Sequence, residues 1–177
     1  MARVILFDFG ETLEHNSNLR EDSLETLEKI KEMKDMNNES VILGLASDFK
    51  LPDDWGAPPL EEQIKRSKED YFMILENLEI RHFFEPVEQN VILSTEVGKT
   101  KDQDIQIFFQ TVVNKISNTN FNQIIFITEN IEHIRTANLL GIKTIFLKLD
   151  NNSNNNNNYT ISNLIESVNI IEEWINN

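Results

Sequence analysis

The stretch Val4-Ile5-Leu6-Phe7-Asp8 is a continuous apolar run that ends in a carboxylate. A short run of this kind, without alternating polar residues, is typical of a strand buried on both faces, as in the centre of a parallel sheet. In open parallel α/β sheets, ligands bind outside the carboxyl ends of the strands. We therefore expect Asp8 to lie at the edge of the sheet where a functional site can form.

Further apolar runs alternate with amphipathic segments along the chain. The strand-like runs cover residues 41–46, 91–93, 124–128 and 144–147. The segments whose apolar residues recur at helical spacing cover about 21–36, 60–78, 102–116, 132–140 and 161–175. This alternation predicts an α/β fold, a three-layer Rossmann-like parallel sheet with helices on both faces.

The length of 177 residues corresponds to one domain. We expect an α/β core over residues 1–149 and a C-terminal helix within 160–177 that packs on this core. Residues 150–159 between them are rich in asparagine. Because such a tract cannot bury apolar surface, we expect a flexible loop there. Trp55, in the Pro- and Gly-containing segment 51–59, fits either an exposed contact or a lid over the core.

The composition excludes several classes of function. The formal net charge is −14, and this field repels phosphate backbones, so we expect no nucleic-acid partner. No run approaches the roughly 18 apolar residues of a membrane span, and the first apolar run is too short for a signal peptide. We therefore expect a cytoplasmic protein with no membrane association. The absence of cysteine excludes disulfides, thiolate catalysis and cysteine-based zinc sites.

Polar residues just after the apolar runs form the candidate site. They are Asp8, Ser47, Glu129 and, a few residues after the run 91–93, Lys101. Since the carboxyl ends of parallel strands meet at one edge, we expect these side chains to converge. An aspartate can attack phosphorus, a lysine and a hydroxyl can stabilise phosphoryl oxygens, and two carboxylates suit Mg²⁺. Structural roles are expected for three histidines that lack partners at metal-ligand spacing: His15, His82 and His133.

Four segments resemble, in order, the motifs of the haloacid dehalogenase-like hydrolase superfamily. They are residues 7–13 (Phe-Asp-Phe-Gly-Glu-Thr-Leu), 45–48 (Leu-Ala-Ser-Asp), 94–101 (Ser-Thr-Glu-Val-Gly-Lys-Thr-Lys) and 127–130 (Ile-Thr-Glu-Asn). One such motif alone is a weak signal. All four occur in the right order, each after a strand-like run, and the resemblance extends from Val4 to Leu147.

The resemblance implies a Mg²⁺-dependent phosphatase, a phosphoric monoester hydrolase that acts through an aspartyl-phosphate. Asp8 would be the nucleophile, Ser47 would bind the phosphoryl group, and Lys101 would neutralise charge. Lys101 fits the spacing of the motif better than Lys99. The implied substrate is a phosphorylated small molecule or a phosphoprotein. The implied Mg²⁺ ligands are Asp8, Glu129 and the backbone carbonyl of Gly10.

Two positions depart from the family pattern. Gly10 stands where the phosphatases usually have a second aspartate, which protonates the leaving group and then activates water. Glu129 stands where aspartate is usual, and its extra methylene moves the carboxylate by about one bond length, although Mg²⁺ demands near-ideal geometry. These departures favour an alternative: a catalytically weak or inactive relative that serves as a binding or regulatory module. A phospho-acceptor receiver domain fits less well, because its lysine is expected near the last strand and Lys101 comes too early.

The intervals between the motifs indicate how the site is covered. Thr12 to Ser47 and Asp48 to Ser94 are too short for the larger cap domains that many relatives insert at these places. We therefore expect a capless core with an open site. Such a site suits a bulky substrate, such as a phosphoprotein, or a small one bound with low selectivity. Alternatively, a partner protein supplies the missing cover.

Overall fold

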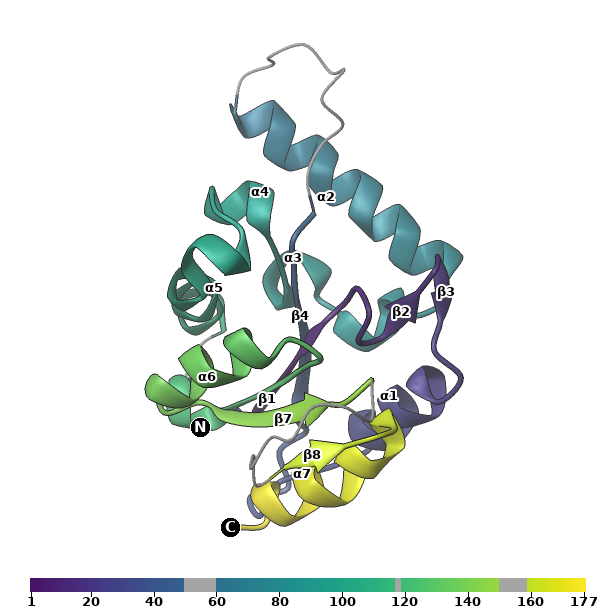
Figure 1. Cartoon of the computed structure of the whole chain (residues 1–177), viewed down its shortest axis with the longest axis vertical. Coiled ribbons are helices and arrows are strands. Elements are labelled where there is room, and N and C mark those ends of the chain that lie inside the picture. The colour runs from purple at the N-terminus through teal and green to yellow at the C-terminus, as the bar shows by residue number, and fades with distance from the viewer. Residues whose placement is uncertain (50–59, 117–118, 150–158) are drawn as a thin grey trace.

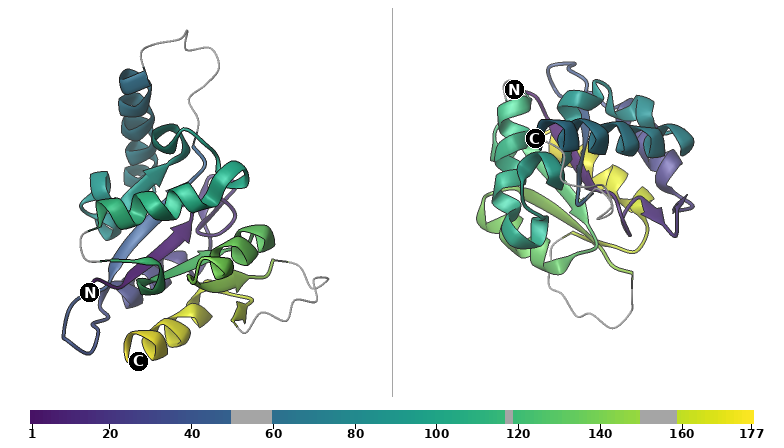
Figure 2. Two further views of the ribbon diagram at one scale, coloured as in Figure 1. Left: turned by 90° about the vertical axis from the view of Figure 1, so that its left-hand side faces the viewer. Right: turned by 90° about the horizontal axis from the view of Figure 1, so that it is seen from above.

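The computed structural model describes residues 1–49, 60–116, 119–149 and 159–177 (Figure 1). At its centre is a six-stranded parallel sheet in the order β5-β4-β1-β6-β7-β8. The strands are β1 (Val4–Asp8), β4 (Ile42–Ser47), β5 (Val91–Leu93), β6 (Ile124–Thr128), β7 (Lys143–Leu147) and β8 (Thr160–Ile161). Parallel neighbours require crossover connections, and helices lie on both faces of the sheet (Figure 2). The predicted α/β class is confirmed.

Helices and short turns cover the two faces. The α-helices are α1 (Ser23–Lys31), α2 (Leu60–Asn77), α3 (Val87–Asn90), α4 (Ser94–Val97), α5 (Lys101–Lys115), α6 (Ile131–Leu139) and α7 (Ser167–Ile175). Three short 3₁₀ segments are η1 (Arg81–Phe84), η2 (Phe121–Gln123) and η3 (Leu164–Glu166). A separate antiparallel hairpin consists of β2 (Glu14–His15) and β3 (Asn18–Leu19).

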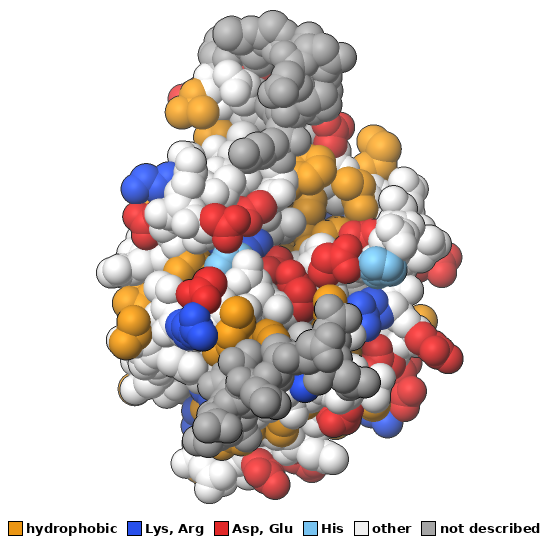
Figure 3. Space-filling model, viewed as in Figure 1, with side chains coloured by type: hydrophobic (Ala, Val, Ile, Leu, Met, Phe, Trp, Pro, Cys, Tyr) orange, Lys and Arg blue, Asp and Glu red, His pale blue; other side chains and the backbone are white. Residues whose placement is uncertain are grey.

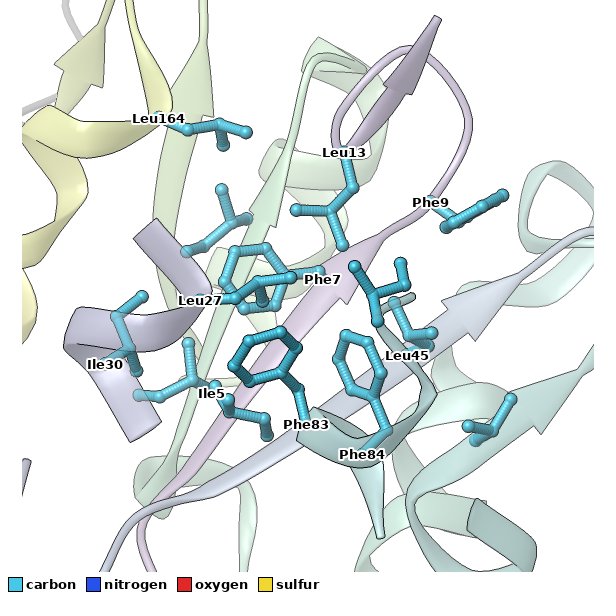
Figure 4. Close-up of a cluster of buried hydrophobic side chains, with 14 of the residues drawn as sticks. Ile5, Phe7, Phe9, Leu13, Leu27, Ile30, Leu45, Phe83, Phe84 and Leu164 are labelled. Carbon is cyan, nitrogen blue, oxygen red and sulfur yellow. The ribbon is translucent and has the colours of Figure 1, made fainter. Parts of the chain in front are cut away.

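Strand β1 contributes alternate side chains to two hydrophobic layers. Ile5 and Phe7 pack in the layer that includes residues of α1, α2 and α7 (Figure 4). Val4 and Leu6 pack in the opposite layer, with residues of α5 and α6. All four side chains are fully buried. Since full burial of one such side chain contributes about 1.5–3 kcal/mol, this packing fixes β1 and the residue at its end.

The register of the central strands brings the predicted site residues to one edge. Asp8 pairs with Ala46 of β4, and Phe7 pairs with Ile127 of β6. Thr128 is therefore level with Asp8 on one side, and the residue after Ala46 lies one step further along on the other. The carboxyl ends of the three strands thus meet around Asp8.

Two helices are shorter than the sequence predicts. The segment expected over 21–36 ends as α1 at Lys31, because the chain soon turns back. The Asp35 carboxylate accepts hydrogen bonds from the backbone N–H groups of Asn37 and Glu39 and stabilises this turn. The segment expected over 161–175 becomes helical only in its later part, because residues 160–161 pair with β7 as strand β8.

The hairpin β2–β3 is not predicted by the sequence. Its turn holds Asn16 and Ser17 at positive φ angles of 53° and 64°, and the surrounding residues show no alternation of apolar and polar side chains. Trp55 and the Asn-rich tract 150–158 lie outside the described residues, so the expectations for them stay predictions.

The intervals between the strands hold no separate cap domain within the described ranges. Between β1 and β4 the chain forms the hairpin and α1, and between β4 and β5 the described residues form α2, η1 and α3. The core therefore has the capless or minimal-cap form that the sequence predicts. No described helix combines the length and apolarity needed to cross a bilayer.

Candidate active site

Asp8, the last residue of β1, is the centre of a buried polar network. The Lys101 ammonium and the Phe9 N–H donate hydrogen bonds to Oδ1, each at 2.9 Å. The Thr128 hydroxyl donates to Oδ2 at 3.0 Å. Burial by itself raises the pKa of Asp8, but contacts with His133, Lys101 and Thr128 outweigh burial and hold the pKa below its ordinary value. The carboxylate is therefore ionised at neutral pH.

Lys101 reaches this carboxylate from the first turn of α5. Thr100 and Gln103 form a capping box that fixes the start of the helix. The Lys101 N–H donates to Asp48 Oδ1 at 2.8 Å, which ties the helix start to the residue after β4. The ammonium also donates to the Ala46 carbonyl at 3.0 Å. These contacts hold the lysine side chain in one orientation.

The two lysines of the loop before α5 have different surroundings. The Lys99 side chain is 50% exposed and pairs with Asp104 at 3.1 Å. The Lys101 side chain is 3% exposed and pairs with Asp8 at 2.9 Å. Since a buried ammonium is stable only with partners, the contact with Asp8 accounts for the burial of Lys101. The sequence-based preference for Lys101 over Lys99 agrees with this placement.

Ser47 ends β4 and lines the same cleft as Asp8. Its side chain is buried. The Tyr71 hydroxyl of α2 interacts with Ser47, although the contact lacks the geometry of a regular hydrogen bond. The Tyr71 ring packs edge-on against Phe9 and Phe49, with centroid separations of 5.5 and 5.2 Å. The sequence places Tyr71 on the inner face of its helix, and its place in the site follows only from the packing of α2.

Glu129 follows β6 and approaches Asp8 through a shared hydroxyl. Thr128 Oγ1 lies 3.0 Å from Asp8 Oδ2 and 3.4 Å from Glu129 Oε2. The Thr12 hydroxyl also donates a hydrogen bond to Oε2. Burial, and then the negative charge of Asp8, raise the pKa of Glu129. The two carboxylates therefore lie close enough for the charge of Asp8 to act on Glu129.

The pair Asp8 and Glu129 is the part of the site that would hold a cation. No group of three or more His, Asp or Glu side chains that could hold a metal occurs in the described parts of the chain. Mg²⁺ keeps several of its waters and binds proteins through as few as one or two carboxylates. Gly10, whose carbonyl is a further candidate ligand, also lines the cleft. The chemistry of this donor set, two carboxylates linked through the Thr128 hydroxyl and a nearby backbone carbonyl, fits Mg²⁺.

His133 lies in the site, although the sequence analysis expects a structural role for it. Its Nε2 is 2.8 Å from Asp102 Oδ1, and its Nδ1 is 3.8 Å from Asp8 Oδ2. Nδ1 is buried and has no hydrogen-bond partner among the described residues. Burial lowers the pKa of His133, but contacts with Asp8 and Asp102 outweigh burial and raise it. His133 lies in the first turn of the helix that follows β6. This position in the sequence could have indicated that it belongs to the site.

A cleft of about 670 Å³ opens beside these residues. Tyr71 and Ile74 of α2 and Leu78 just beyond it form an apolar wall, and Glu11 and Glu14 line the cleft from the segment around the hairpin. Figure 3 shows the face that carries the cleft, where acidic side chains gather next to hydrophobic ones. The predicted open site is thus bounded by α2 and by the segment after β1.

The sequence matches no family model and no curated protein. Solved structures match it in fold. A hydrolase of the haloacid dehalogenase (HAD) superfamily from Ehrlichia chaffeensis has a TM-score of 0.63 at 15% identity, over 99% of this chain and 100% of that chain. A putative HAD hydrolase from Bacillus subtilis, bound to magnesium, has a TM-score of 0.62 at 15% identity, over 88% of this chain and 57% of that chain. A HAD phosphatase from Thermococcus onnurineus has a TM-score of 0.57 at 15% identity, over 86% and 58% of the two chains.

These matches differ in how much of each known protein they cover. The chain spans 57% and 58% of the length of the Bacillus and Thermococcus proteins. It spans the whole of the Ehrlichia protein, and this end-to-end match supports a capless or minimal-cap form. The similarity in structure agrees with the order of motifs in the sequence. The chain therefore has the fold of the haloacid dehalogenase-like hydrolases, in a small form without a large cap.

Proposed function

We propose that the chain is a Mg²⁺-dependent hydrolase of phosphate monoesters that acts through an aspartyl-phosphate on Asp8. The observation that carries this proposal is the buried Asp8 carboxylate, which lines a cleft and accepts a hydrogen bond from Lys101 at 2.9 Å. A carboxylate held in this way is oriented for nucleophilic attack, and the neighbouring ammonium would stabilise the charge of the phosphoryl oxygens.

Two displacements at phosphorus make up the proposed reaction. In the first, an Asp8 oxygen attacks phosphorus, the bond between phosphorus and the alcohol oxygen breaks, and the alcohol oxygen takes a proton from solvent. In the second, water attacks the aspartyl-phosphate, phosphate leaves and the carboxylate is regenerated. Lys101 and the Ser47 hydroxyl would bind phosphoryl oxygens in both steps.

Mg²⁺, when bound, would neutralise phosphoryl charge and orient the ester. Asp8, Glu129 and the Gly10 carbonyl would hold it. The position of Glu129, which shares the Thr128 hydroxyl with Asp8, and the magnesium in the Bacillus HAD hydrolase of the same fold support this assignment. His133, when protonated, would add positive charge beside Asp8.

Gly10 predicts the kinetic character of the enzyme. No side chain at this position can protonate the leaving alcohol or activate water, a contribution typically of about 10²–10⁴ in rate. The adjacent Glu11 is half-exposed and pairs with His15 at 2.7 Å. We therefore expect slow turnover, fastest for esters whose alcohols leave without protonation, and a phosphorylated Asp8 that hydrolyses slowly.

The second candidate is a catalytically weak or inactive protein that binds a ligand or a partner at the same cleft. The observation that favours it is Gly10, which lacks the acid–base group, whereas the ordered Lys101–Asp8 pair favours the enzyme. The cleft volume of about 670 Å³ suits a phosphorylated small molecule better than a folded phosphoprotein. A partner protein that covers the open side stays a prediction.

The test is hydrolysis of a panel of phosphate monoesters with and without Mg²⁺, beside Asp8→Asn. We expect Mg²⁺-dependent phosphate release that Asp8→Asn abolishes. Lys99→Met serves as a control beside Lys101→Met, because both remove a lysine from one loop and only Lys101 contacts Asp8. Phosphate release at the same rate from folded Asp8→Asn protein would refute the proposed nucleophile. No release by either protein would favour the binding module.

A further inference from the structure

The cleft beside Asp8 is strongly acidic. Among the described residues that line it there is a single lysine, Lys101, and no arginine. Six carboxylates line the same space: Asp8, Glu11, Glu14, Asp48, Asp102 and Glu129. One Mg²⁺ ion together with Lys101 would therefore leave the lining acidic. A substrate group that carries further negative charge is repelled here.

Four of these acids, Asp8, Glu11, Asp48 and Asp102, have a basic partner. Glu14 and Glu129 have no ion-pair partner among the described residues. Lys101 contacts Asp8 at 2.9 Å and Asp48 at 3.4 Å, and His133 contacts Asp102 at 2.8 Å. The hairpin residue Glu14 accepts a hydrogen bond from the Ser17 N–H, and no ion pair of Glu14 occurs within the described ranges. Its charge therefore remains available to a ligand in the cleft.

An aromatic and aliphatic wall lines the cleft near Glu14. Tyr71 packs edge-on against Phe9 and Phe49, and all three rings line the cleft. Burial raises the pKa of Tyr71 most, and the charges of Asp8 and Glu14 raise it further. Both carboxylates therefore act electrostatically on this ring, so the wall lies near Asp8 and near Glu14.

We propose that the cleft selects phosphate monoesters whose alcohol carries an ammonium group, bound between this aromatic wall and Glu14. The inference rests on the proposed function, since it assigns the leaving group of that reaction. An ammonium group gains from a carboxylate and from an aromatic ring, and Phe49 is the ring of this wall that is partly exposed. A carboxylate or a second phosphate in the same place is repelled by the acidic lining.

Three esters of similar size test this preference: 2-aminoethyl phosphate, propyl phosphate and carboxymethyl phosphate. They place a positive, a neutral and a negative group at the same distance from phosphorus. With Mg²⁺ at low ionic strength, we expect kcat/KM to be at least about 10-fold higher for the ammonium ester than for the carboxylate ester. The neutral ester should lie between them. The ratio should shrink as salt is added, because salt screens the acidic lining.

Glu14→Gln should lower the ratio of kcat/KM for the ammonium ester to kcat/KM for the carboxylate ester by about 3-fold or more. Glu28→Gln is the matched control: it removes the same charge from the exposed face of α1, outside the cleft, and should leave the ratio unchanged. Equal kcat/KM for the three esters, or a ratio that Glu14→Gln leaves unchanged, would overturn the inference while the hydrolase stands. If no ester is hydrolysed, the proposed function fails. Equal affinities of the three esters in calorimetry would then overturn the charge preference as well.

Discussion

Two lysine–carboxylate networks lie in this small fold, and they differ in what surrounds them. In the first, Lys101 is 3% exposed and contacts Asp8 at 2.9 Å beside the cleft. In the second, Lys115 is 22% exposed and pairs with Glu96. Lys68 joins the same Glu96 at 3.4 Å, so that side chains of α2, α4 and α5 are connected.

The comparison separates a network that holds a site from one that holds helices together. Burying an ion pair is itself weak support for stability, because loss of hydration offsets the attraction. The second network connects neighbouring helices, and we expect it to have structural consequences only. The first fixes an ionised carboxylate at the carboxyl ends of the strands, where parallel sheets bind ligands. The proposed function follows from this difference in position.

The largest expected effect is that of Lys101→Met. The variant removes the ammonium from Asp8, so we expect phosphate release to fall by about 10³-fold. The unpaired buried carboxylate should also lower the free energy of unfolding by about 3–5 kcal/mol. Combining it with Asp8→Asn should restore part of that stability, as measured by urea unfolding. A double variant no more stable than Lys101→Met alone would refute the coupling between these two residues.

The next effect is a gain of activity in Gly10→Asp. A Cβ added at Gly10 meets nothing within 4 Å, so the position accepts a side chain without rearrangement. A carboxyl group there would protonate the leaving alcohol and activate water, and we expect kcat to rise by roughly 10²-fold. Steady-state phosphate release measures it, with Gly10→Asn as the control that cannot transfer protons. Equal rates for the two variants would show that proton transfer is not what Gly10 lacks.

Lys115→Met should lower the stability of the protein without lowering its activity, in contrast to Lys101→Met. It removes a hydrogen bond to the Glu88 carbonyl at 3.0 Å and the pair with Glu96. We expect a loss of about 1–2 kcal/mol in the free energy of unfolding and unchanged kcat/KM at temperatures where the variant is folded. A fall in kcat/KM comparable to that of Lys101→Met would show that the second network also supports the site, which would contradict this comparison.

The smallest effect concerns Glu129→Gln, which should stabilise the metal-free protein. The pKa of Glu129 is raised by burial and by Asp8, so its ionised form opposes folding at neutral pH. We expect a rise in Tm of roughly 2–4 °C, about 1 kcal/mol, together with weaker Mg²⁺ binding in calorimetry. The gain should disappear as the pH falls through the raised pKa, because the native carboxyl is then protonated and neutral. A lower Tm at neutral pH in the absence of metal would contradict this account.

The sequence predicts the sheet well because its strands are buried on both faces. The run from Val4 to Asp8 admits no polar residue before its end, and all four apolar side chains are fully buried. The same rule places Ser47 at the end of β4 and Glu129 directly after β6. Since the register of parallel strands brings their ends together, convergence on Asp8 follows from the pattern alone.

The rest of the site depends on contacts between distant segments, which no local pattern encodes. His133 reaches Asp8 and Asp102 only because α6 starts beside α5. Tyr71 enters the cleft through the packing of α2, and the hairpin that carries Glu14 has too few apolar residues to be recognised as strands. Local periodicity in the sequence indicates which residues are buried. Contacts between residues of distant segments can be identified only from the tertiary structure.

Trapping of the aspartyl-phosphate tests the central claim most directly. Protein incubated with Mg²⁺ and a hydrolysed phosphate ester is quenched and treated with borohydride, which reduces an aspartyl-phosphate to homoserine, and position 8 is read by peptide mass spectrometry. Because Gly10 cannot activate water, the intermediate should accumulate, and we predict homoserine at position 8 only when ester and Mg²⁺ are both present. Turnover with unmodified Asp8 in every sample would contradict the account.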